Sequence, residues 1–307
     1  MLKYILKRIG IGLITLFVLA SITFFLNKIM PGSPFSQDNK VMDPKTMEAL
    51  QAKYGLDKPI MEQYVVYFKN AMVGDFGESI SKKGQTVAGI IAKRAPITAK
   101  LGIIAFVISL IIGITLGIVS ALTKRKWINN IITFIATIGV SLPSFLLALI
   151  LMIVFGVILQ ALPTVGLKTF NSYILPASTL ALYPISMITR LTRSSLRDVM
   201  NKDYITLAES KGSGQLKTTI KHGLKNALLP VVTYCGPMFA GLVTGSFVVE
   251  KVFTIPGIGN EFVSSVTNRD YTLIMGLTIF LGAIVILMNL ITDIVAGFID
   301  PRIKLEK

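Results

Sequence analysis

Residues able to carry chemistry are scarce in this chain of 307 residues. His222 is the only histidine and Cys235 the only cysteine, so we expect no histidine-based metal cluster and no intramolecular disulfide. The segment Gly-Ser-Gly-Gln-Leu-Lys-Thr at 212–218 is not a phosphate-binding loop, because Leu216 stands where such a loop needs a glycine before its lysine. We therefore predict no catalytic residues, no metal and no nucleotide on this chain, so that any ATP would be bound by another protein.

Asp293, with Asn289 one turn before it, is the one acidic residue that falls well inside an apolar run. Charged groups inside a bilayer mark ion or proton paths, and an ion-driven carrier normally has more of them. Two interpretations of this polar pair stay open, a hydrogen bond between helices and an ion-coupling site. Cys235, at the start of another apolar run, is expected to be a packing residue.

The apolar runs around these residues indicate the fold class. Hydrophobic residues make up 52% of the chain and charged residues 15%, with a mean hydropathy of +0.69, whereas a soluble domain has about 25% charged residues. Runs of roughly 17–25 apolar residues are long enough to cross a bilayer as helices. We expect an all-α membrane protein with six transmembrane helices, at 9–29, 100–122, 129–160, 173–192, 227–249 and 273–298. The third could bend at Pro143, and Pro176 and Pro184 interrupt the fourth.

Basic residues collect on one side of these six helices. If the N-terminus is cytoplasmic, the inner segments 1–8, 123–127, 190–225 and 300–307 contain 17 of the 31 Lys and Arg residues and 5 acidic ones. This asymmetry predicts that both termini are cytoplasmic, and that the first apolar run is a retained helix rather than a signal peptide. The net charge of +15 is then a topology signal and a contact for anionic lipids, and we expect no nucleic-acid partner.

Four regions follow from this topology: an N-terminal transmembrane helix (1–29), an extracytoplasmic region (30–99), a five-helix core (100–299) and a cytoplasmic tail (300–307). Helices are predicted at 44–54 and 59–73, with a turn at 73–79, in a region that either contacts a partner or only covers the first two spans. The segment 252–259 is read as an outer turn, with a gate and a scaffold both open. Two G-x-x-x-G pairs predict close helix packing, Gly113 with Gly117 and Gly241 with Gly245.

The segment 198–226 places charges between two apolar runs. Helix-forming residues on both sides of Gly-Ser-Gly at 212–214 predict two short helices, 203–211 and 215–226, that meet at a glycine corner. The second has an apolar stripe flanked by basic residues: Leu216, Ile220 and Leu224, with Lys217, Lys221 and Lys225. The residues alone leave open a helix lying on lipid head groups and a docking element for another protein.

This segment resembles the cytoplasmic loop of ABC-importer permeases of the peptide and nickel branch. That branch reads D-Y-I-x-x-A-x-x-K-G and then H-x-L-x-N-A-x-x-P, which is matched here by Asp203, Tyr204, Ile205, Ala208, Lys211, Gly212, His222, Leu224, Asn226, Ala227 and Pro230. The general permease pattern, E-A-A-x3-G-x9-I-x-L-P, is matched only at its alanine, its glycine and its leucine. Other similar stretches are the N-terminal MLKYILKRIG, the outer YGLDKPIMEQY and the SLPSF of the third span, and 236–271 is most similar to oligopeptide permeases.

The resemblance implies a permease subunit in a bacterial inner membrane, forming half of the pathway of an ATP-driven oligopeptide importer. The alternative is a dipeptide or nickel-chelate importer. Implied partners are a second permease chain, two ATPase subunits that bind ATP and Mg, and an extracytoplasmic peptide-binding protein. The resemblance also implies an ATPase-coupling loop that contains Asp203, Tyr204, Ala208, Glu209, Lys211, Gly212, His222, Asn226 and Pro230. Two other classes are rivals. A self-contained channel or carrier predicts functional charges in the spans, which are scarce, and a structural membrane protein gives no reason for this basic, glycine-cornered loop.

Overall fold

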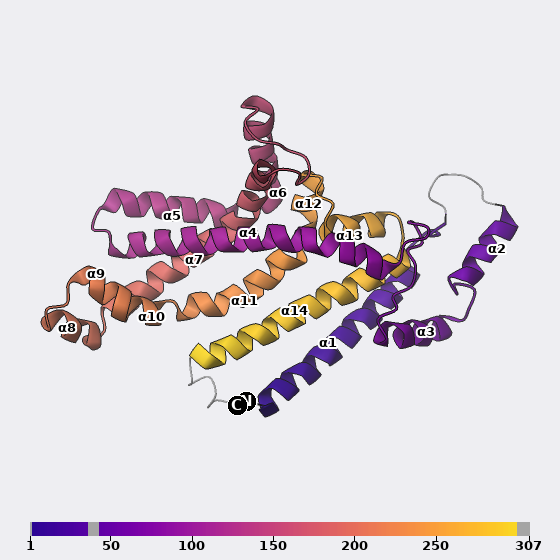
Figure 1. Ribbon diagram of the computed structural model, residues 1–307, viewed down its shortest axis with the longest axis horizontal. Coiled ribbons are helices and arrows are strands. Elements are labelled where there is room, and N and C mark those ends of the chain that lie inside the picture. The colour runs from indigo at the N-terminus through magenta and orange to yellow at the C-terminus, as the bar shows by residue number, and fades with distance from the viewer. Residues whose placement is uncertain (1, 36–42, 300–307) are drawn as a thin grey trace. The chain divides into compact units, whose positions relative to one another are not determined.

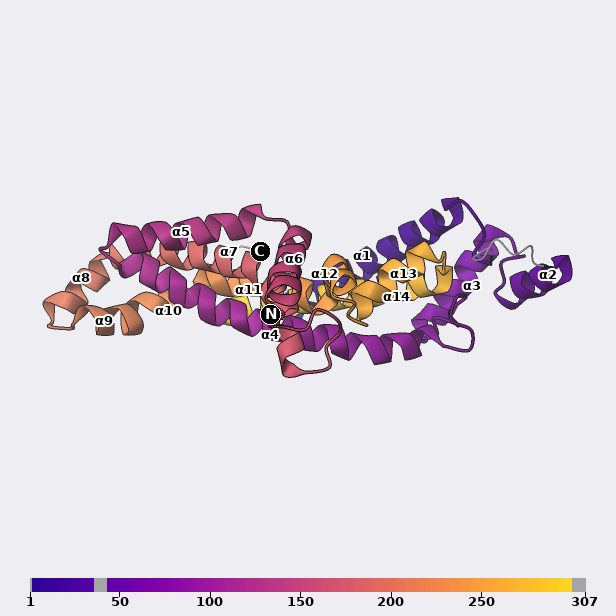
Figure 2. The ribbon, with the colours of Figure 1, turned by 90° about the horizontal axis from the view of Figure 1, so that it is seen from above.

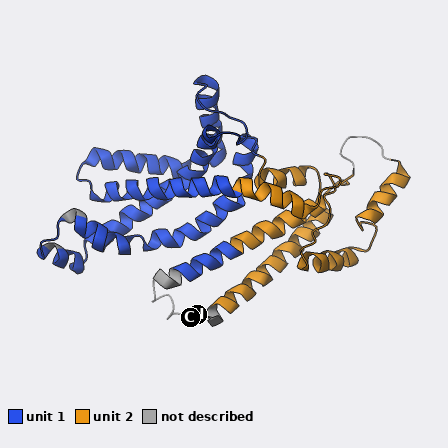
Figure 3. Ribbon diagram, in the orientation of Figure 1, with its two compact units in different colours: residues 1, 99–255, 287–307 blue, residues 2–98, 256–286 orange. Residues whose placement is uncertain are grey.

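The computed structural model describes residues 2–35 and 43–299, and within these ranges the regular structure is helical (Figure 1). The chain forms two compact units, unit 1 with residues 99–255 and 287–299 and unit 2 with residues 2–35, 43–98 and 256–286 (Figure 3). Helices α4 (Val87–Leu122) and α14 (Tyr271–Ile299) contribute to both units. The predicted tail at 300–307 lies outside the described residues, and the division into topological regions stays a prediction.

Five helical stretches in the described residues are long and apolar enough to cross a bilayer: Ile5–Ile29, Val87–Leu122, Phe170–Met200, Leu229–Val252 and Tyr271–Val295. They belong to α1 (Leu2–Ile29), α4, α7 (Ile174–Met200), α11 (Leu229–Thr244) with α12 (Phe247–Val252), and α14. The remaining predicted span is a bent pair, α5 (Lys126–Ser141) and α6 (Ser144–Leu151), which η1 (Met152–Ile158) continues. The bend is 110°, and it occurs at Pro143, as predicted (Figures 1 and 2).

Three helices extend beyond the spans predicted for them, and α1 begins at Leu2 rather than near residue 9. Helix α4 begins at Val87 rather than near residue 100, and α7 continues to Met200 rather than ending near 192. Apolarity marks only the part of a helix that suits the bilayer, whereas good helix formers extend it into polar surroundings. The prediction that Pro176 and Pro184 interrupt the fourth span was wrong, because α7 is one helix from Ile174 to Met200. Pro176 lies in its first turn, where a missing N–H removes no hydrogen bond, and Pro184 stands inside the helix without ending it.

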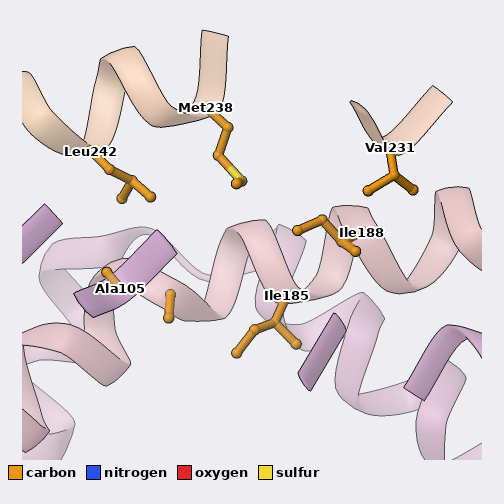
Figure 4. Packing of buried hydrophobic residues seen from close by; sticks show 7 residues of the cluster. Ala105, Ile185, Ile188, Val231, Met238 and Leu242 are labelled. Atoms are coloured by element: carbon orange, nitrogen blue, oxygen red, sulfur yellow. The ribbon is translucent and has the colours of Figure 1, made fainter. Parts of the chain in front are cut away.

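Unit 1 is built around α7, which packs against α5, α6, α10 (Leu224–Ala227) and α11. Its buried apolar cluster consists of Ala105, Ala181, Ile185, Ile188, Val231, Met238 and Leu242. Figure 4 shows Met238 and Leu242 reaching from α11 toward α7, where Ile185 and Ile188 lie. Without a hydrophobic drive in lipid, such close packing is what holds spanning helices together.

The first G-x-x-x-G pair packs as predicted. A Cβ on Gly113 would lie 2.8 Å from Ile188 Cβ, and one on Gly117 would lie 2.5 Å from Thr192 Cβ, so these glycines let α4 approach α7. The second predicted pair is wrong. Gly241 has no atom within 4 Å of its Cβ position, and Gly245 ends α11 with φ +90°.

Gly113→Ala should therefore destabilise the protein by about 1–3 kcal/mol, because the added methyl group overpacks the α4–α7 contact. Gly241→Ala is the matched control, and its stability should stay within about 0.5 kcal/mol of the wild type. Thermal unfolding of both variants in detergent measures the difference. Equal stability of the two variants would contradict the packing assigned to Gly113.

Unit 2 contains α1, α2 (Pro44–Lys53), α3 (Ile60–Met72) and α13 (Ile258–Thr267), with the first parts of α4 and α14. The predicted helices at 44–54 and 59–73 are confirmed, and so is the turn at 73–79, where Gly74 and Gly77 have positive φ. Its apolar core is formed by Val87, Ile90, Ile91, Ile258, Leu273 and Leu277. Rings of α1 and α3 also meet, with the centroids of Phe24 and Tyr64 5.3 Å apart.

Buried carboxylates hold unit 2 together, a feature that the sequence did not reveal. Asp270 accepts hydrogen bonds from Ser79 Oγ, from Ser81 Oγ at 2.7 Å, and from the backbone N–H groups of Ser81 (3.0 Å) and Ile80 (3.1 Å). Burial alone would raise the pKa of Asp270, but these hydrogen bonds outweigh it and hold the pKa below its ordinary value of 3.8. Glu261 likewise pairs with Lys82 and, at 2.9 Å, with Arg94 Nε.

Asp270→Asn should destabilise unit 2 by about 1–3 kcal/mol, because an amide NH2 would face buried donors. The wild-type carboxylate stabilises the fold above its unfolded-state pKa near 3.8, and this stabilisation is lost as the pH falls through the lower folded-state pKa. Because an amide does not titrate, the stability of the variant should lack the part of the pH dependence that the Asp270 carboxylate causes. Protease resistance of residues 43–98 between pH 7 and pH 3 measures both effects, with the exposed Asp57→Asn as control.

Candidate functional site

The predicted coupling loop lies at one end of unit 1 (Figures 1 and 2). After α7 ends at Met200, the chain forms α8 (Asp203–Ser210), turns at 211–214, and continues as α9 (Gln215–Thr218), η3 (Thr219–Gly223) and α10. The prediction of two short helical arms at a glycine corner is thus confirmed, with a π-helical turn inside the second arm. Short turns join the arms to helices of the bundle, at 201–202 after α7 and at Leu228 before α11.

The corner depends on Gly212. Its φ is +84°, a conformation that glycine adopts readily and that strains other residues. This turn lets the Ser213 N–H donate to the Ala208 carbonyl at 3.2 Å, next to a bond from the Lys211 N–H to Leu207 O, also 3.2 Å. The geometry explains why a glycine stands at this position of the motif.

A hydrogen bond between the two arms fixes their spacing. Asn226 Nδ2 donates to Tyr204 Oη at 3.0 Å, which joins α10 to α8 and brings together two residues that the sequence motif singled out. Ile205 of α8 is buried, with 1% of its surface exposed. At the start of the second arm, Thr218 Oγ1 donates a hydrogen bond to the Ser213 carbonyl at 3.3 Å. These contacts make the loop a defined structural element.

The buried face of the second arm differs from the stripe predicted in the sequence. Thr219, Gly223 and Ala227 are buried, whereas Ile220 is 58% exposed. A Cβ on Gly223 would lie 3.3 Å from Met200 Sδ, so the arm packs closely on the end of α7. The π turn has more residues than an α turn, which changes the face that each following residue takes.

The loop consequently presents apolar and basic side chains together. Tyr204, Leu207 and Ile220 are 42%, 56% and 58% exposed. Four lysines on the same two arms are exposed as well: Lys211, Lys217, Lys221 and Lys225. The loop therefore combines an exposed apolar surface with positive charge.

The other predicted residues take less distinctive places. Asp203 and Pro230 are exposed, Ala208 and His222 are half-buried, and the side chain of Glu209 lies outside the described part of the structure. In α14, Asn289 is exposed and Asp293 half-buried, so both interpretations of that pair stay predictions. Cys235 is half-buried beside the apolar cluster of unit 1.

A hollow of about 550 Å³ opens in unit 1 beside the bend between α5 and α6. Helices α7 and α11 complete its wall, and the lining includes Ser141, Pro143, Tyr183, Tyr234, Pro237 and Gly241. Gly241 therefore borders open space, which accounts for its missing helix contact. The residues that line this hollow were not predicted individually, although prolines and glycines on three successive spans were a signal for irregular packing.

Unit 2 has a hollow of its own, of about 420 Å³, lined among others by Phe24, Lys28, Tyr67 and Tyr271. Lys28 hydrogen-bonds to Gln63 there, and its ammonium lies 5.4 Å from the centre of the Phe24 ring. Burial raises the pKa of Tyr67, which keeps its phenol neutral. The residues that line this hollow belong to unit 2, whereas the predicted loop belongs to unit 1. The hollow is therefore not part of the candidate site.

Comparison with known proteins covers the chain almost from end to end. Residues 113–305 match the family model described as "Binding-protein-dependent transport system inner membrane component", and residues 1–102 match the model of its N-terminal part. The chain is 40% identical over 305 residues to the dipeptide transport system permease protein of Lactococcus lactis, covering 99% of this chain and 100% of that one. It is 42% identical over 307 residues to the oligopeptide transport system permease protein of Salmonella typhimurium, with coverage of 99% and 100%.

Among solved structures, a chain of the MetNI methionine ABC transporter, crystallised in inward-facing conformations, has the same fold. The TM-score is 0.55 at 17% sequence identity, with 69% of this chain and 96% of that chain covered. Together with the apolar helices, these matches show a multi-pass membrane protein with the predicted all-α permease fold.

Proposed function

This chain belongs to the family of binding-protein-dependent transport inner membrane components, and from that premise we propose that it is the permease subunit of an ATP-driven oligopeptide importer. The observation that carries the proposal is the full-length similarity, 40–42% identity, to permeases named for oligopeptide transport. Dipeptide import is the second candidate, since relatives from Lactococcus lactis and Bacillus subtilis at 40% identity are named for it.

The proposed complex contains a second permease chain, two ATPase subunits that bind ATP and Mg, and an extracytoplasmic peptide-binding protein. In a bacterial inner membrane with both termini in the cytoplasm, the loop at 198–226 would face the ATPases. Its exposed Tyr204, Leu207 and Ile220 would enter a groove, while the lysines would meet acidic residues at the rim. In this arrangement the chain itself is not an enzyme and carries no cofactor.

The structure suggests how ATPase movement could reach the transport pathway. Because the bond between Asn226 and Tyr204 and the turn at Gly212 fix the loop, a push on it would pass to α7 and α11 together. The same two helices line the hollow of unit 1, which we propose as this chain's part of the pathway. Rigid movement of both helices would then open the hollow to alternate sides.

The identity of the cargo can be tested by measuring the uptake of labelled peptides by cells that lack this gene and by the same cells with the gene restored. We expect restored cells to take up a labelled tetrapeptide, and to take up a labelled dipeptide only if the second candidate is correct. Nickel uptake is the control, and its restoration without peptide uptake would exclude both candidates.

Gly212→Arg and Lys211→Glu test the loop. Arginine cannot adopt φ +84° without strain, and glutamate reverses a charge on the proposed docking surface, so both should uncouple ATP hydrolysis from uptake. The measurement is peptide-stimulated ATPase activity and uptake by the reconstituted complex, which should fall at least tenfold with normal membrane insertion.

Lys124→Glu is the matched control, because Lys124 is exposed between α4 and α5, outside the loop. It should keep both activities. Unchanged coupling in both loop variants would rule out the assigned role of the loop.

A further inference from the structure

Helix α7 carries three arginines in its C-terminal part, at and beyond the end of the span predicted at 173–192. Arg190, Arg193 and Arg197 are spaced three and four residues apart, so they lie along one face of the helix. With a rise of about 1.5 Å per residue, they are spread over roughly 10 Å of its length. Arg190 and Arg197 are exposed, and Arg193 is half-buried.

Neutral oxygens, rather than carboxylates, bind these guanidinium groups. Arg190 Nη2 donates to Thr137 Oγ1 at 3.1 Å, and Arg193 Nη1 donates to Thr133 Oγ1 at 2.8 Å. Arg197 Nη2 makes a longer contact, 3.4 Å, to the Ser120 carbonyl. Within the described residues none of the three forms an ion pair, and each guanidinium has five N–H donors, so most of its donors remain available.

Polar residues of α5 lie along the arginines and continue to the hollow of unit 1. Asn130, Thr133, Thr137 and Ser141 recur every three or four residues on α5, and Ser141 lines the hollow. On α7, Tyr183 also lines the hollow, and it precedes Arg190 in the sequence. We call this set the polar seam: Asn130, Thr133, Thr137 and Ser141 of α5, with Tyr183, Arg190, Arg193 and Arg197 of α7.

The span predicted in α7 ends near residue 192, so Arg193 and Arg197 lie in the predicted cytoplasmic segment 190–225 and Arg190 lies at its border. Long arginine side chains at such a helix end reach water. The seam therefore leads from the hollow to the predicted cytoplasmic end of α7, which favours a water-accessible exit for the cargo.

We propose that the polar seam recognises the carboxylate of the cargo in transit, with Arg190 and Arg193 as the binding groups. This inference rests on the proposed function. Peptides differ in their side chains but share a free C-terminal carboxylate, which is the anion that a planar guanidinium fork binds best. Three arginines spaced along α7 would give several binding sites of low affinity instead of one site of high affinity, so that the cargo could pass from one to the next.

The test compares one labelled tripeptide with a free C-terminus and the same tripeptide as its C-terminal amide. Uptake of each is measured in the reconstituted complex with the same binding protein, so that any selectivity of the binding protein is common to all variants. In Arg190→Gln the preference for the free carboxylate should fall about tenfold relative to wild type, as expected for one charge-assisted hydrogen bond. Arg190→Lys should keep part of the preference, because it retains the charge without the fork.

Arg125→Gln is the matched control, an exposed arginine at the start of α5 that is not in the seam. It should leave the preference unchanged. Arg193→Gln provides a second seam variant should Arg190→Gln fail to assemble.

Three results would overturn the proposal. Equal loss of both peptides in the seam variants would indicate a structural contact or a contact with the second permease chain. An effect that occurs only in vesicles with phosphatidylglycerol, and not in phosphatidylcholine alone, would indicate that the arginines bind lipid phosphate. An unchanged preference in both Arg190→Gln and Arg193→Gln would remove carboxylate recognition from the seam. Failure of the wild type to carry either peptide would instead count against the proposed function.

Discussion

The close packing of α7 is the contact on which the other features of unit 1 depend. Gly113 and Gly117 let α4 approach α7, and Met238 and Leu242 of α11 pack on another part of it. Held in this way, α7 runs without interruption from the hollow to Met200, and only Asn201 and Lys202 separate it from α8. A helix that is continuous over this distance can transmit displacement, which a chain of short segments joined by flexible turns could not do.

The loop meets two requirements that usually conflict. For the proposed docking role, its surface has to expose apolar groups to a partner, while its backbone has to be rigid without the burial that normally stabilises such groups. Polar contacts solve this problem, since the bond from Asn226 to Tyr204 and the turn at Gly212 fix the two arms from within. Only the inner face, at Ile205 and Ala227, is secured by burial.

Much of this architecture could be predicted from the sequence, because an apolar run long enough for a bilayer is rarely anything but a spanning helix. The bend at Pro143 and the glycine corner were also predictable, since each depends on the residue itself. What could not be predicted depends on neighbours. The π turn that buries Thr219 and exposes Ile220 has no signature in the pattern, and neither does the burial of Asp270, whose partners lie about 190 residues away in the sequence.

The polar seam shows how a pathway could combine weak selectivity with a fixed orientation of its cargo. The hollow is lined largely by proline, glycine, tyrosine and aliphatic residues, which tolerate many side chains. The seam offers charge at one edge only, where threonine hydroxyls already hold the guanidinium groups of Arg190 and Arg193 in place. A passing carboxylate would use donors that these bonds leave free, so α5 and α7 need not separate to bind it. Movement of α7 on the proposed coupling stroke would then shift the arginines along with the cargo, and the energy of ATP hydrolysis would act on the one group that all peptides share.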